Sequence, residues 1–338
     1  MAVTIREVAR QLNLSITQVS RALDGYADVS EETRQRVIET AHQMGYVPNR
    51  AARQLRRQRT DTIGFVLPTS TPQFTEPFFA EFMAGLADEA ALHNLDLLVS
   101  TAPPEQNAEE LLYQRWVQGR KVDGIILNRV RLADWRIRYL AQQKIPFVSL
   151  ERSLDPVDYA SIEVDSRTGF ASMMEYLMEL GHHRIAYVGG PGALKINVDR
   201  LTGYRDGLKR ANLPPDSSLE VNGDLTSQGG YQAALRLFSL PQPPTAIACV
   251  NDYTAMGVLH AAHERGLVIG RDLSVTGFDG VGESAHTEPP LTTLAQPVYE
   301  IARKLVSMLS TLICGDEVEE KRVRYRPKLV IRSSTGNL

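Results

Sequence analysis

The stretch VTIREVARQLNLSITQVSRAL at residues 3–23 decides the first part of the fold. Apolar residues at positions 5, 8, 9 and 12 are spaced so that their side chains share one face of a helix. Asn13 follows them, and asparagine tolerates the left-handed backbone conformation that ends a helix and turns the chain. The pattern therefore predicts a short helix from Thr4 to Leu12 and then a turn.

Two more helices are expected in the next thirty residues. Ser15 and Ser30 are each placed to cap a helix through the side-chain oxygen. Gly25 and Gly45 follow the two apolar stripes and end them. The residues expected to face inward are Val19, Ala22 and Leu23 in the second helix and Val37, Ile38, Ala41 and Met44 in the third.

Three short helices, with about three residues between the first two, predict a helix-turn-helix unit. In this unit the N-terminal residues of the second helix enter the DNA major groove. Arg21 could bond guanine O6 and N7 as a fork, and Thr17 or Gln18 could reach other base edges. The alternative is a three-helix bundle in which Ile16 packs inside and Arg21 is only solvated. The candidate DNA contacts, to bases or phosphates, are Thr4, Ser15, Ile16, Thr17, Gln18, Ser20, Arg21, Ser30 and Thr33.

The segment PNRAARQLRRQRT at residues 48–60 has five Arg between positions 50 and 59. Two helical turns are marginal in water, and the arginines repel one another, so we expect the segment to order only when phosphates neutralise it. An exposed leucine in such a helix suits a wedge in the minor groove. A flexible charged linker is the alternative. The candidate contacts in the segment are Asn49, Arg50, Arg53 and Leu55.

Charge and composition separate this head from the rest of the chain. Residues 1–60 carry a net charge of +4 and the remaining residues carry −7, a layout typical of a nucleic-acid reader with a second module. The N-terminus holds charge where a secretory signal would be apolar, and no apolar run is long enough to cross a membrane. Cys249 and Cys314 form neither a disulfide framework nor a metal motif. We therefore expect a cytoplasmic protein without a membrane partner.

After residue 60, short β-rich runs alternate with helical stretches, which predicts an α/β body with parallel sheets. The expected strands cover residues 62–67, 95–100, 122–127, 146–150, 184–189, 246–250 and 274–278. The expected helices cover residues 79–93, 109–118, 169–180, 199–211 and 254–265. The pattern occurs about twice, so we expect two similar lobes.

Ligands of such folds bind outside the carboxyl ends of the strands and in clefts between domains. Polar residues follow several strands, and the aromatic residues Phe74, Phe78 and Phe79 follow the first. Carboxylates and amides bond sugar hydroxyls, and aromatic faces cover the C–H side of a ring. The polar candidates are Asn128, Arg129, Glu151, Arg152, Asn251, Asp252 and Asp279.

Each candidate also has a structural interpretation. Asp and Asn after a strand often cap the next helix, and we favour this role for Asp252. Of the adjacent Phe78 and Phe79, we expect at most one to face the cleft. Arg129 and Arg152 could be surface residues.

Motifs for enzyme chemistry were not found. The Gly-rich run GGPGAL at residues 189–194 lacks both the Lys-Ser/Thr of a phosphate loop and the GxGxxG spacing. Ser284 and His286 lie close together without a nucleophile elbow, and His182 and His183 have no Glu or Cys at metal spacing. We interpret these as loop structure and predict no enzymatic activity, no cofactor and no metal.

Fixed-spacing motifs also give the chain a family resemblance. The head carries VTIREVA at 3–9, LSITQVSRAL at 14–23, VSEETR at 29–34 and GYVPN at 45–49. The body carries GHHRIAYVGGP at 181–191, NDYTAMG at 251–257, GFDG at 277–280 and PLTTLAQP at 290–297. With these motifs the sequence resembles the lactose-repressor (LacI/GalR) family of bacterial transcription factors. Asn13 departs from the glycine more usual in the turn.

The resemblance implies roles for individual residues. Ile16, Thr17 and Arg21 would read bases, and Leu55 would be the minor-groove lever. The body would resemble periplasmic sugar-binding proteins, with an effector between two lobes joined by three crossovers. The implied effector contacts are Arg200, Asn251, Asp279 and Gln296, with Phe79, Asn128 and Glu151, and Arg129 completes the predicted set. The run at 128–137 resembles members that respond to glycosides, and the absence of a heptad tail implies a dimer.

The predicted architecture has three parts. Residues 1–47 form an all-α helix-turn-helix head, and residues 48–60 form a hinge. Residues 61–338 form a two-lobe body, with lobe 1 at about 61–160 and 292–322 and lobe 2 at about 161–291 and 323–338.

The predicted function is sequence-specific repression of transcription. A homodimer would bind pseudo-palindromic double-stranded operator DNA, and a small carbohydrate would control its affinity. Three alternatives stay open at this point: a regulator whose ligand strengthens DNA binding, a sugar-binding transport protein, and a sugar-metabolising enzyme.

Overall fold

The computed structural model describes residues 3–26, 28–46, 59–67, 76–102 and 107–338. Internal contacts divide the chain into two compact units, Met1–Thr60 and Asp61–Leu338. The boundary between the two units coincides with the start of the body predicted at residue 61.

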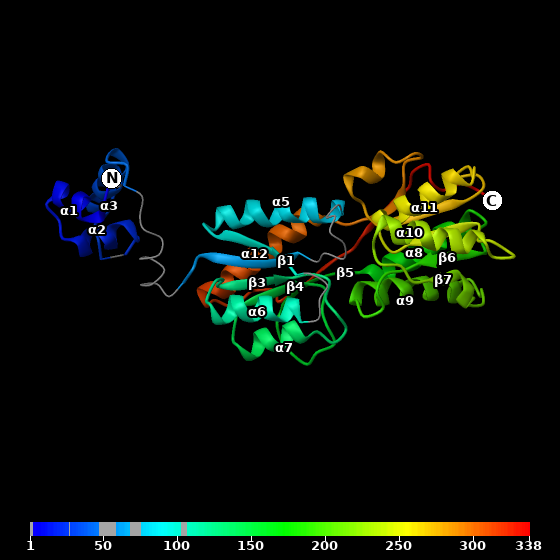
Figure 1. Cartoon of the computed structure of the whole chain (residues 1–338), viewed down its shortest axis with the longest axis horizontal. Coiled ribbons are helices and arrows are strands. Elements are labelled where there is room, and N and C mark those ends of the chain that lie inside the picture. The colour runs from blue at the N-terminus through cyan, green and yellow to red at the C-terminus, as the bar shows by residue number, and fades with distance from the viewer. Residues whose placement is uncertain (1–2, 27, 47–58, 68–75, 103–106) are drawn as a thin grey trace. The chain divides into compact units, whose positions relative to one another are not determined.

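The described residues of the head form three helices, α1 (Ile5–Leu12), α2 (Ile16–Leu23) and α3 (Glu31–Gln43) (Figure 1). Asn13 has the left-handed φ of 54° expected of the turn residue. The Ser15 and Gln18 side chains form a reciprocal capping box at the start of α2, which satisfies backbone N–H groups that the helix itself leaves free. The core that holds the helices together consists of Val8, Ala9, Val19, Ala22, Val37 and Ala41.

One residue of the predicted head core points outward. Ile38 is 45% exposed, although its neighbour Val37 is fully buried. Adjacent residues of a helix are rotated by about 100° from one another, so only one of the two can face a core as small as this one. Val37 takes the inward position, and the prediction for Ile38 was wrong.

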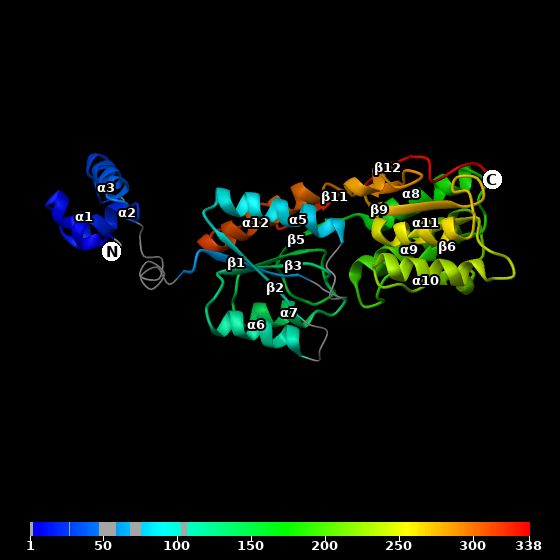
Figure 2. The same cartoon turned by 45° about the horizontal axis from the view of Figure 1, so that its top comes forward.

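Lobe 1 of the body is a six-stranded parallel sheet in the order β11-β5-β4-β3-β1-β2. Helices α5 (Pro77–Leu92) and α12 (Val298–Cys314) cover one face, and α6 (Ala108–Gln118) and α7 (Trp135–Gln142) cover the other (Figure 2). The strands are β1 (Thr62–Leu67), β2 (Asp96–Thr101), β3 (Gly124–Leu127), β4 (Phe147–Leu150), β5 (Ala160–Val164) and β11 (Arg322–Tyr325). The central strands of this sheet are apolar because helices cover both faces of the sheet.

Lobe 2 repeats this plan with the order β12-β10-β9-β8-β6-β7, in which only the β10–β12 pair is antiparallel. The strands are β6 (Ile185–Val188), β7 (Glu220–Val221), β8 (Ala246–Cys249), β9 (Ser274–Asp279), β10 (Thr292–Ala295) and β12 (Lys328–Val330). The helices are α8 (Ser166–Glu179) and α9 (Lys195–Arg210) on one face and α10 (Ser227–Phe238) and α11 (Asp252–Glu264) on the other. Two short 3-10 helices, η1 (Ser217–Leu219) and η2 (Gly282–Ala285), lie in loops.

The chain passes between the lobes at three places, each a few residues later than predicted. Strand β5 runs to Val164 in the lobe 1 sheet, β10 pairs with β9 of lobe 2, and β11 runs to Tyr325 in lobe 1. The predicted boundaries after residues 160, 291 and 322 therefore need correction. Pairing partners of short strands are distant in sequence, so the sequence pattern does not show which sheet a strand joins.

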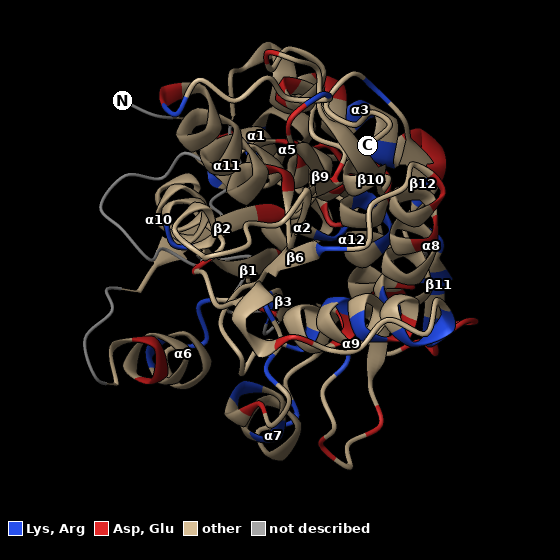
Figure 3. Ribbon diagram, turned by 90° about the vertical axis from the view of Figure 1, so that its right-hand side faces the viewer, with Lys and Arg blue, Asp and Glu red and all other residues tan. Residues whose placement is uncertain are grey.

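The outer helices of lobe 2 carry charges of both signs. Figure 3 shows acidic and basic segments next to one another along α9. Arg205 pairs with Glu220 at 2.6 Å and Arg210 pairs with Glu175 at 2.5 Å.

Among the described residues, no helix is both long enough and apolar enough to span a membrane.

Candidate functional site

A cavity with about 410 Å³ of empty space, part of it open to solvent, lies between the two lobes of the body. All eight predicted ligand residues line it: Phe79, Asn128, Arg129, Glu151, Arg200, Asn251, Asp279 and Gln296. The other lining residues are Glu76, Phe78, Leu150, Ile196 and Leu225.

The parallel topology explains why residues so far apart in sequence meet here. Asn128 and Arg129 follow β3, Glu151 follows β4, Asn251 follows β8, and Asp279 ends β9. The carboxyl ends of parallel strands lie at one edge of a sheet, and the two such edges of the body face the cavity.

Three of these residues have a backbone conformation that is rare outside glycine. The φ angle is 49° at Arg129, 71° at Glu151 and 114° at Asp279. Positive φ angles in residues with a Cβ are strained, and they persist where the surrounding structure holds them. Their concentration at one cavity is typical of a functional site.

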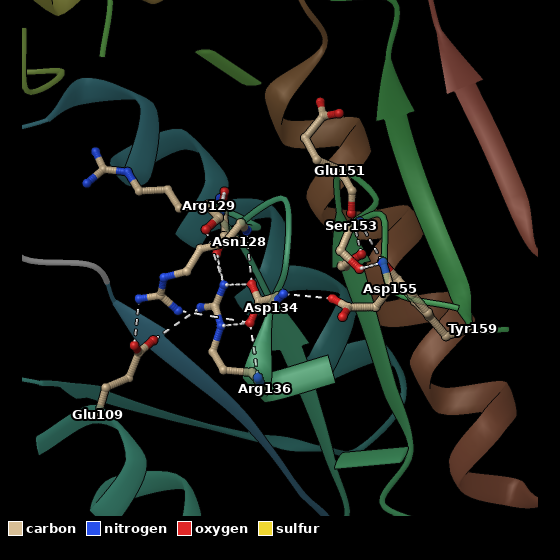
Figure 4. A network of polar contacts seen from close by, with 11 residues as sticks. Glu109, Asn128, Arg129, Asp134, Arg136, Glu151, Ser153, Asp155 and Tyr159 are labelled. Carbon is tan, nitrogen blue, oxygen red and sulfur yellow. Dashed lines mark hydrogen bonds and ion pairs between the residues drawn. The ribbon is translucent and has the colours of Figure 1, made fainter. Parts of the chain in front are cut away.

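The strained turn at Arg129 rests on a buried network that the sequence analysis did not single out (Figure 4). Arg136 donates through Nη2 to the carbonyl oxygens of Asn128 at 3.2 Å and Arg129 at 3.1 Å. Asp134 caps α7 and accepts from Arg136 Nε at 2.9 Å and from Nη2 at 2.6 Å. Burial alone would raise the pKa of Asp134, but the hydrogen bond and charge of Arg136 lower it below its ordinary value. The pair therefore fixes the lobe 1 side of the cavity.

On the lobe 2 side, Arg200 and Gln296 hold Asp279. Arg200 donates through Nη1 to the Val250 carbonyl at 2.5 Å and through Nη2 to Asp279 Oδ1 at 3.5 Å. Its guanidinium lies over the Phe278 ring, 3.7 Å from the centroid. Gln296 Nε2 donates to the same Asp279 oxygen at 2.7 Å. Burial raises the pKa of Asp279 to about 8 although the Arg200 charge opposes this shift.

Two further carboxyl groups face the cavity from lobe 1. Glu76 forms an ion pair with Arg129, and its other oxygen accepts from Asn251 Nδ2 of lobe 2 at 3.4 Å. Glu151 accepts from the Val164 backbone N–H at 3.3 Å. Burial, together with the negative charge of Asp199, raises the pKa of Glu151 to about 8. The cavity thus contains groups that both donate and accept hydrogen bonds near neutral pH.

Two buried donors at the cavity are without a partner among the described residues. They are Nδ2 of Asn128 and Nε of Arg200. A buried donor without an acceptor costs about 1–3 kcal/mol, so a ligand with hydroxyl or ether oxygens would recover this free energy. Phe78 and Phe79 add aromatic surface on which the apolar face of a sugar ring could pack.

The two phenylalanines differ from the prediction, because both line the cavity and both are buried. They lie in the first turn of α5, with ring planes nearly perpendicular at 89° and ring centroids 5.2 Å apart. The cavity meets the end of this helix, so two adjacent residues can both contact it. Phe74 lies outside the described residues.

The structural roles considered for Asn251, Asp252 and Arg152 have different outcomes. Asn251 caps α11 by accepting from Thr254 N at 2.9 Å, and it also lines the cavity. Asp252 does not line the cavity, but it does not cap α11 either, because Asn251 is the N-cap. It accepts from Gly280 N at 2.8 Å and from Thr293 Oγ1 at 2.5 Å, and burial raises its pKa to about 7. Arg152 donates to backbone carbonyls of its own loop and does not line the cavity.

The histidine and serine motifs are also structural. His182 lies between the hydroxyls of Thr245 and Ser274, at 3.0 and 2.8 Å. The Ser284 hydroxyl donates to the Val281 carbonyl at 2.6 Å and accepts from Arg332 at 3.1 Å. Within the described ranges, no group of three or more metal-binding side chains comes together.

In the head, the first turn of α2 presents its side chains to solvent. Ile16 is 45% exposed and does not pack inside, so the bundle alternative does not describe it. Ser15, Thr17 and Gln18 are exposed as well. The surface predicted to read bases is therefore accessible.

Arg21 lies one turn further along α2 and already has contacts. It pairs with Asp28 at 2.5 Å, and its guanidinium lies over the Tyr26 ring, 4.7 Å from the centroid. Its side chain remains 42% exposed, so a base edge can compete for the same donors.

The predicted phosphate contacts have different environments. The Thr4 hydroxyl donates to Glu7 Oε2 at 2.9 Å, and the Ser30 hydroxyl accepts from Thr33 N at 3.3 Å. Thr4 and Ser30 are exposed and Thr33 is half-buried. Ser20 is only 4% exposed and donates to Asp24 at 3.4 Å. Because it lies on the inward face of α2, we no longer assign it a phosphate contact.

The predicted contacts of the hinge, Asn49, Arg50, Arg53 and Leu55, lie outside the described residues.

Comparisons with known proteins agree with this layout. A family profile described as "Bacterial regulatory proteins, lacI family" matches residues 4–49, and one described as "Periplasmic binding protein-like domain" matches residues 174–335. The chain is 36% identical over 344 residues to the HTH-type transcriptional regulator AglR of Rhizobium meliloti (strain 1021), covering 99% of this chain and 95% of AglR.

Two solved structures extend the comparison to the fold. The lac repressor dimer bound to operator and the anti-inducer ONPF has a TM-score of 0.84 at 27% identity, covering 99% of both chains. The transcriptional regulator CelR in complex with cellobiose has a TM-score of 0.75 at 28% identity, covering 98% of this chain and 99% of CelR. With a relative 36% identical along nearly its whole length, the chain belongs to the LacI family of bacterial DNA-binding transcriptional regulators, which are not enzymes.

Proposed function

We propose that this protein is a cytoplasmic repressor whose affinity for operator DNA is controlled by a small carbohydrate, a glycoside or disaccharide, bound between the two lobes. The observation that carries the proposal is the cavity itself. Unpartnered donors of Asn128 and Arg200, the acceptor oxygens of Asp279 and Glu151 and two phenylalanine rings meet there. This combination suits a ring with several hydroxyl groups. The CelR–cellobiose complex supports a disaccharide, since CelR is a relative with the same fold.

The DNA-binding form is proposed to be a homodimer. Two heads would read the half-sites of a pseudo-palindrome through Thr17, Gln18 and Arg21, while the two hinge segments lie in the central minor groove. The operator-bound lac repressor dimer supports this arrangement. Exposed hydroxyls of the head would bond phosphates and fix the register.

The sugar would act by favouring one arrangement of the two lobes over another. If that arrangement separates the starts of the two hinge segments near Asp61, the hinge helices lose their partner and DNA affinity falls. A coupling free energy of about 1–3 kcal/mol is typical of such control. Operator titrations with and without sugar give the sign, and a rise in affinity would identify the ligand as a co-repressor.

The variant Asp279→Asn tests the proposal directly. Asparagine tolerates the positive φ at this position better than most residues, so the fold is preserved while an amide replaces the carboxyl group. Operator binding should stay within about twofold of wild type, and the response to sugar should be abolished. Glu175→Gln is the matched control, because Glu175 is an exposed residue that pairs with Arg210 on the outer surface of lobe 2. A normal sugar response in Asp279→Asn would contradict the proposed site.

A further inference from the structure

Glu76 occupies an unusual place at the cavity. It immediately precedes α5 in the N-cap position, yet its side chain makes no capping hydrogen bond. Its carboxylate instead pairs with Arg129 and accepts from Asn251 Nδ2 at 3.4 Å. The side chains of Glu76 and Arg129 are each only 15% exposed. The Glu76 carboxylate forms an ion pair instead of a helix cap, so the ion pair with Arg129 determines its position.

Among the described residues, both guanidinium groups at the cavity already have a carboxyl partner. Of the two guanidinium groups that line it, Arg129 pairs with Glu76 and Arg200 contacts Asp279 at 3.5 Å. Glu151 is a third lining carboxyl group, and no described cation lies within ion-pair distance of it. Above about pH 8, where Glu151 and Asp279 are ionised as well, a ligand carrying a carboxylate or phosphate would therefore lose its hydration next to three negative side chains without gaining a free cation.

We propose that Glu76 is a charge filter: by neutralising Arg129 it reserves the cleft for uncharged sugars and excludes uronic and phosphorylated ones. This inference rests on the proposed function, because it assumes that the cavity binds a carbohydrate. Removing the negative charge of Glu76 frees the Arg129 guanidinium, whose fork geometry matches carboxylate and phosphate groups. The filter thus depends on the Glu76 side chain, and the substitution Glu76→Gln removes its charge while nearly preserving its shape.

The test is a set of matched sugar pairs titrated into the full-length protein at about pH 9, where Glu151 and Asp279 are ionised, and followed by thermal shift and calorimetry. Glucose is compared with glucuronate and glucose 6-phosphate, galactose with galacturonate, and trehalose with trehalose 6-phosphate. For the wild-type protein we expect each bound neutral sugar to be preferred over its charged counterpart by about 100-fold or more, since like charges brought together cost several kcal/mol.

In Glu76→Gln the preference for the neutral sugar should fall at least about tenfold, because the charged sugar gains Arg129 as a partner. Glu175→Gln, which makes the same substitution in an exposed ion pair of lobe 2, should keep the wild-type preference.

Three results would contradict the inference or its basis. A charged sugar that binds wild-type protein as tightly as its neutral counterpart would overturn the filter, and this arm needs no variant. An unchanged preference in folded Glu76→Gln would remove the role of Glu76. No response to any sugar, neutral or charged, would contradict the proposed carbohydrate site itself and with it this inference.

Discussion

The buried carboxyl groups of the cavity connect ligand binding to stability at the level of single residues. Burial raises the pKa values of Glu151 and Asp279 to about 8, so in the folded protein both groups retain a proton that the unfolded chain releases near its ordinary pKa of about 4. Their contribution to the free energy of unfolding is therefore complete below pH 4 and is lost as the pH rises to 8. A bound sugar that donates to these groups would offset the loss.

Glu151→Gln should remove this pH dependence at one position. The free energy of unfolding of the variant, relative to wild type, should be greater at pH 8.5 than at pH 5 by on the order of 1–3 kcal/mol, because the amide cannot become a buried charge. Urea denaturation at pH 5, 7 and 8.5 measures the difference. A gap between variant and wild type that stays constant across these pH values would show that Glu151 titrates normally.

In the head, Arg21→Ala should change base preference and not only affinity. Arg21 must exchange Asp28 and Tyr26 for a base edge, and the loss of a guanine fork costs about 1–3 kcal/mol at one base pair. Binding to operators with single base-pair changes should reveal one position that the variant no longer distinguishes. Arg36→Ala removes the same charge from the exposed surface of α3 and is the control. A uniform loss across all operators with Arg21→Ala would contradict a reading role.

The sequence predicted the cavity residues that directly follow strands. It did not predict the residues that hold them in position. Asn128, Glu151, Asn251 and Asp279 follow directly from the rule for strand ends. Arg136 was not predicted, because its importance lies in the carbonyl groups that it reaches across a turn. Glu76 carries no motif, and only its pairing with Arg129 reveals it.

Among the elements, a short backbone clasp between residues 130–132 and 193–195 joins the two lobes beside the cavity. Lys195 N donates to the Val130 carbonyl and Leu132 N donates to the Ala193 carbonyl, each at 2.9 Å. Arg131 and Leu194 form an antiparallel bridge between these bonds. The clasp holds the loop after β3 of lobe 1 to the start of α9 in lobe 2, so it stabilises the observed arrangement of the two lobes.

Lys195→Pro should weaken the clasp without breaking α9. Lys195 is the first residue of that helix, a position where proline is favoured because the helix does not use its N–H. The preceding Leu194 has ψ 130°, which is compatible with a following proline. Loss of one hydrogen bond, about 1 kcal/mol, should weaken sugar binding about fivefold relative to Lys195→Ala, which removes the same charge. Calorimetry on both variants gives the comparison, and equal affinities would show that the clasp does not stabilise the sugar-binding arrangement of the lobes.

The sequence predicted the β-rich runs better than it predicted the full set of elements. Its seven strands all form, with shifts of one or two residues at the ends. It did not single out α7, α10 and α12. Helix α12 is buried along one face against α5, far away in sequence, and this long-range packing, not a local pattern, determines where it lies. The short strands β11 and β12 pair with β5 and β10, each within one lobe, and these partners are distant in sequence.

For the whole molecule, operator binding should depend strongly on salt. The positive charge resides in the head and hinge, while the body is net negative. With about 6–10 phosphates neutralised, affinity should fall by about 10³–10⁵-fold between 50 and 200 mM salt. Binding isotherms over this range give the slope. A shallow slope, equivalent to one or two phosphates, would rule out the proposed contribution of the hinge arginines.

The proposed function depends most on the coupling between sugar binding in the cleft and DNA binding by the head. Linkage requires that a ligand which weakens operator binding is itself bound more weakly by the DNA-bound protein, by the same factor. The decisive measurement is the dissociation constant of the sugar found in the panel, determined calorimetrically with and without saturating operator. We predict an affinity about 5–150-fold lower in the presence of operator. The same affinity in both states would contradict the account.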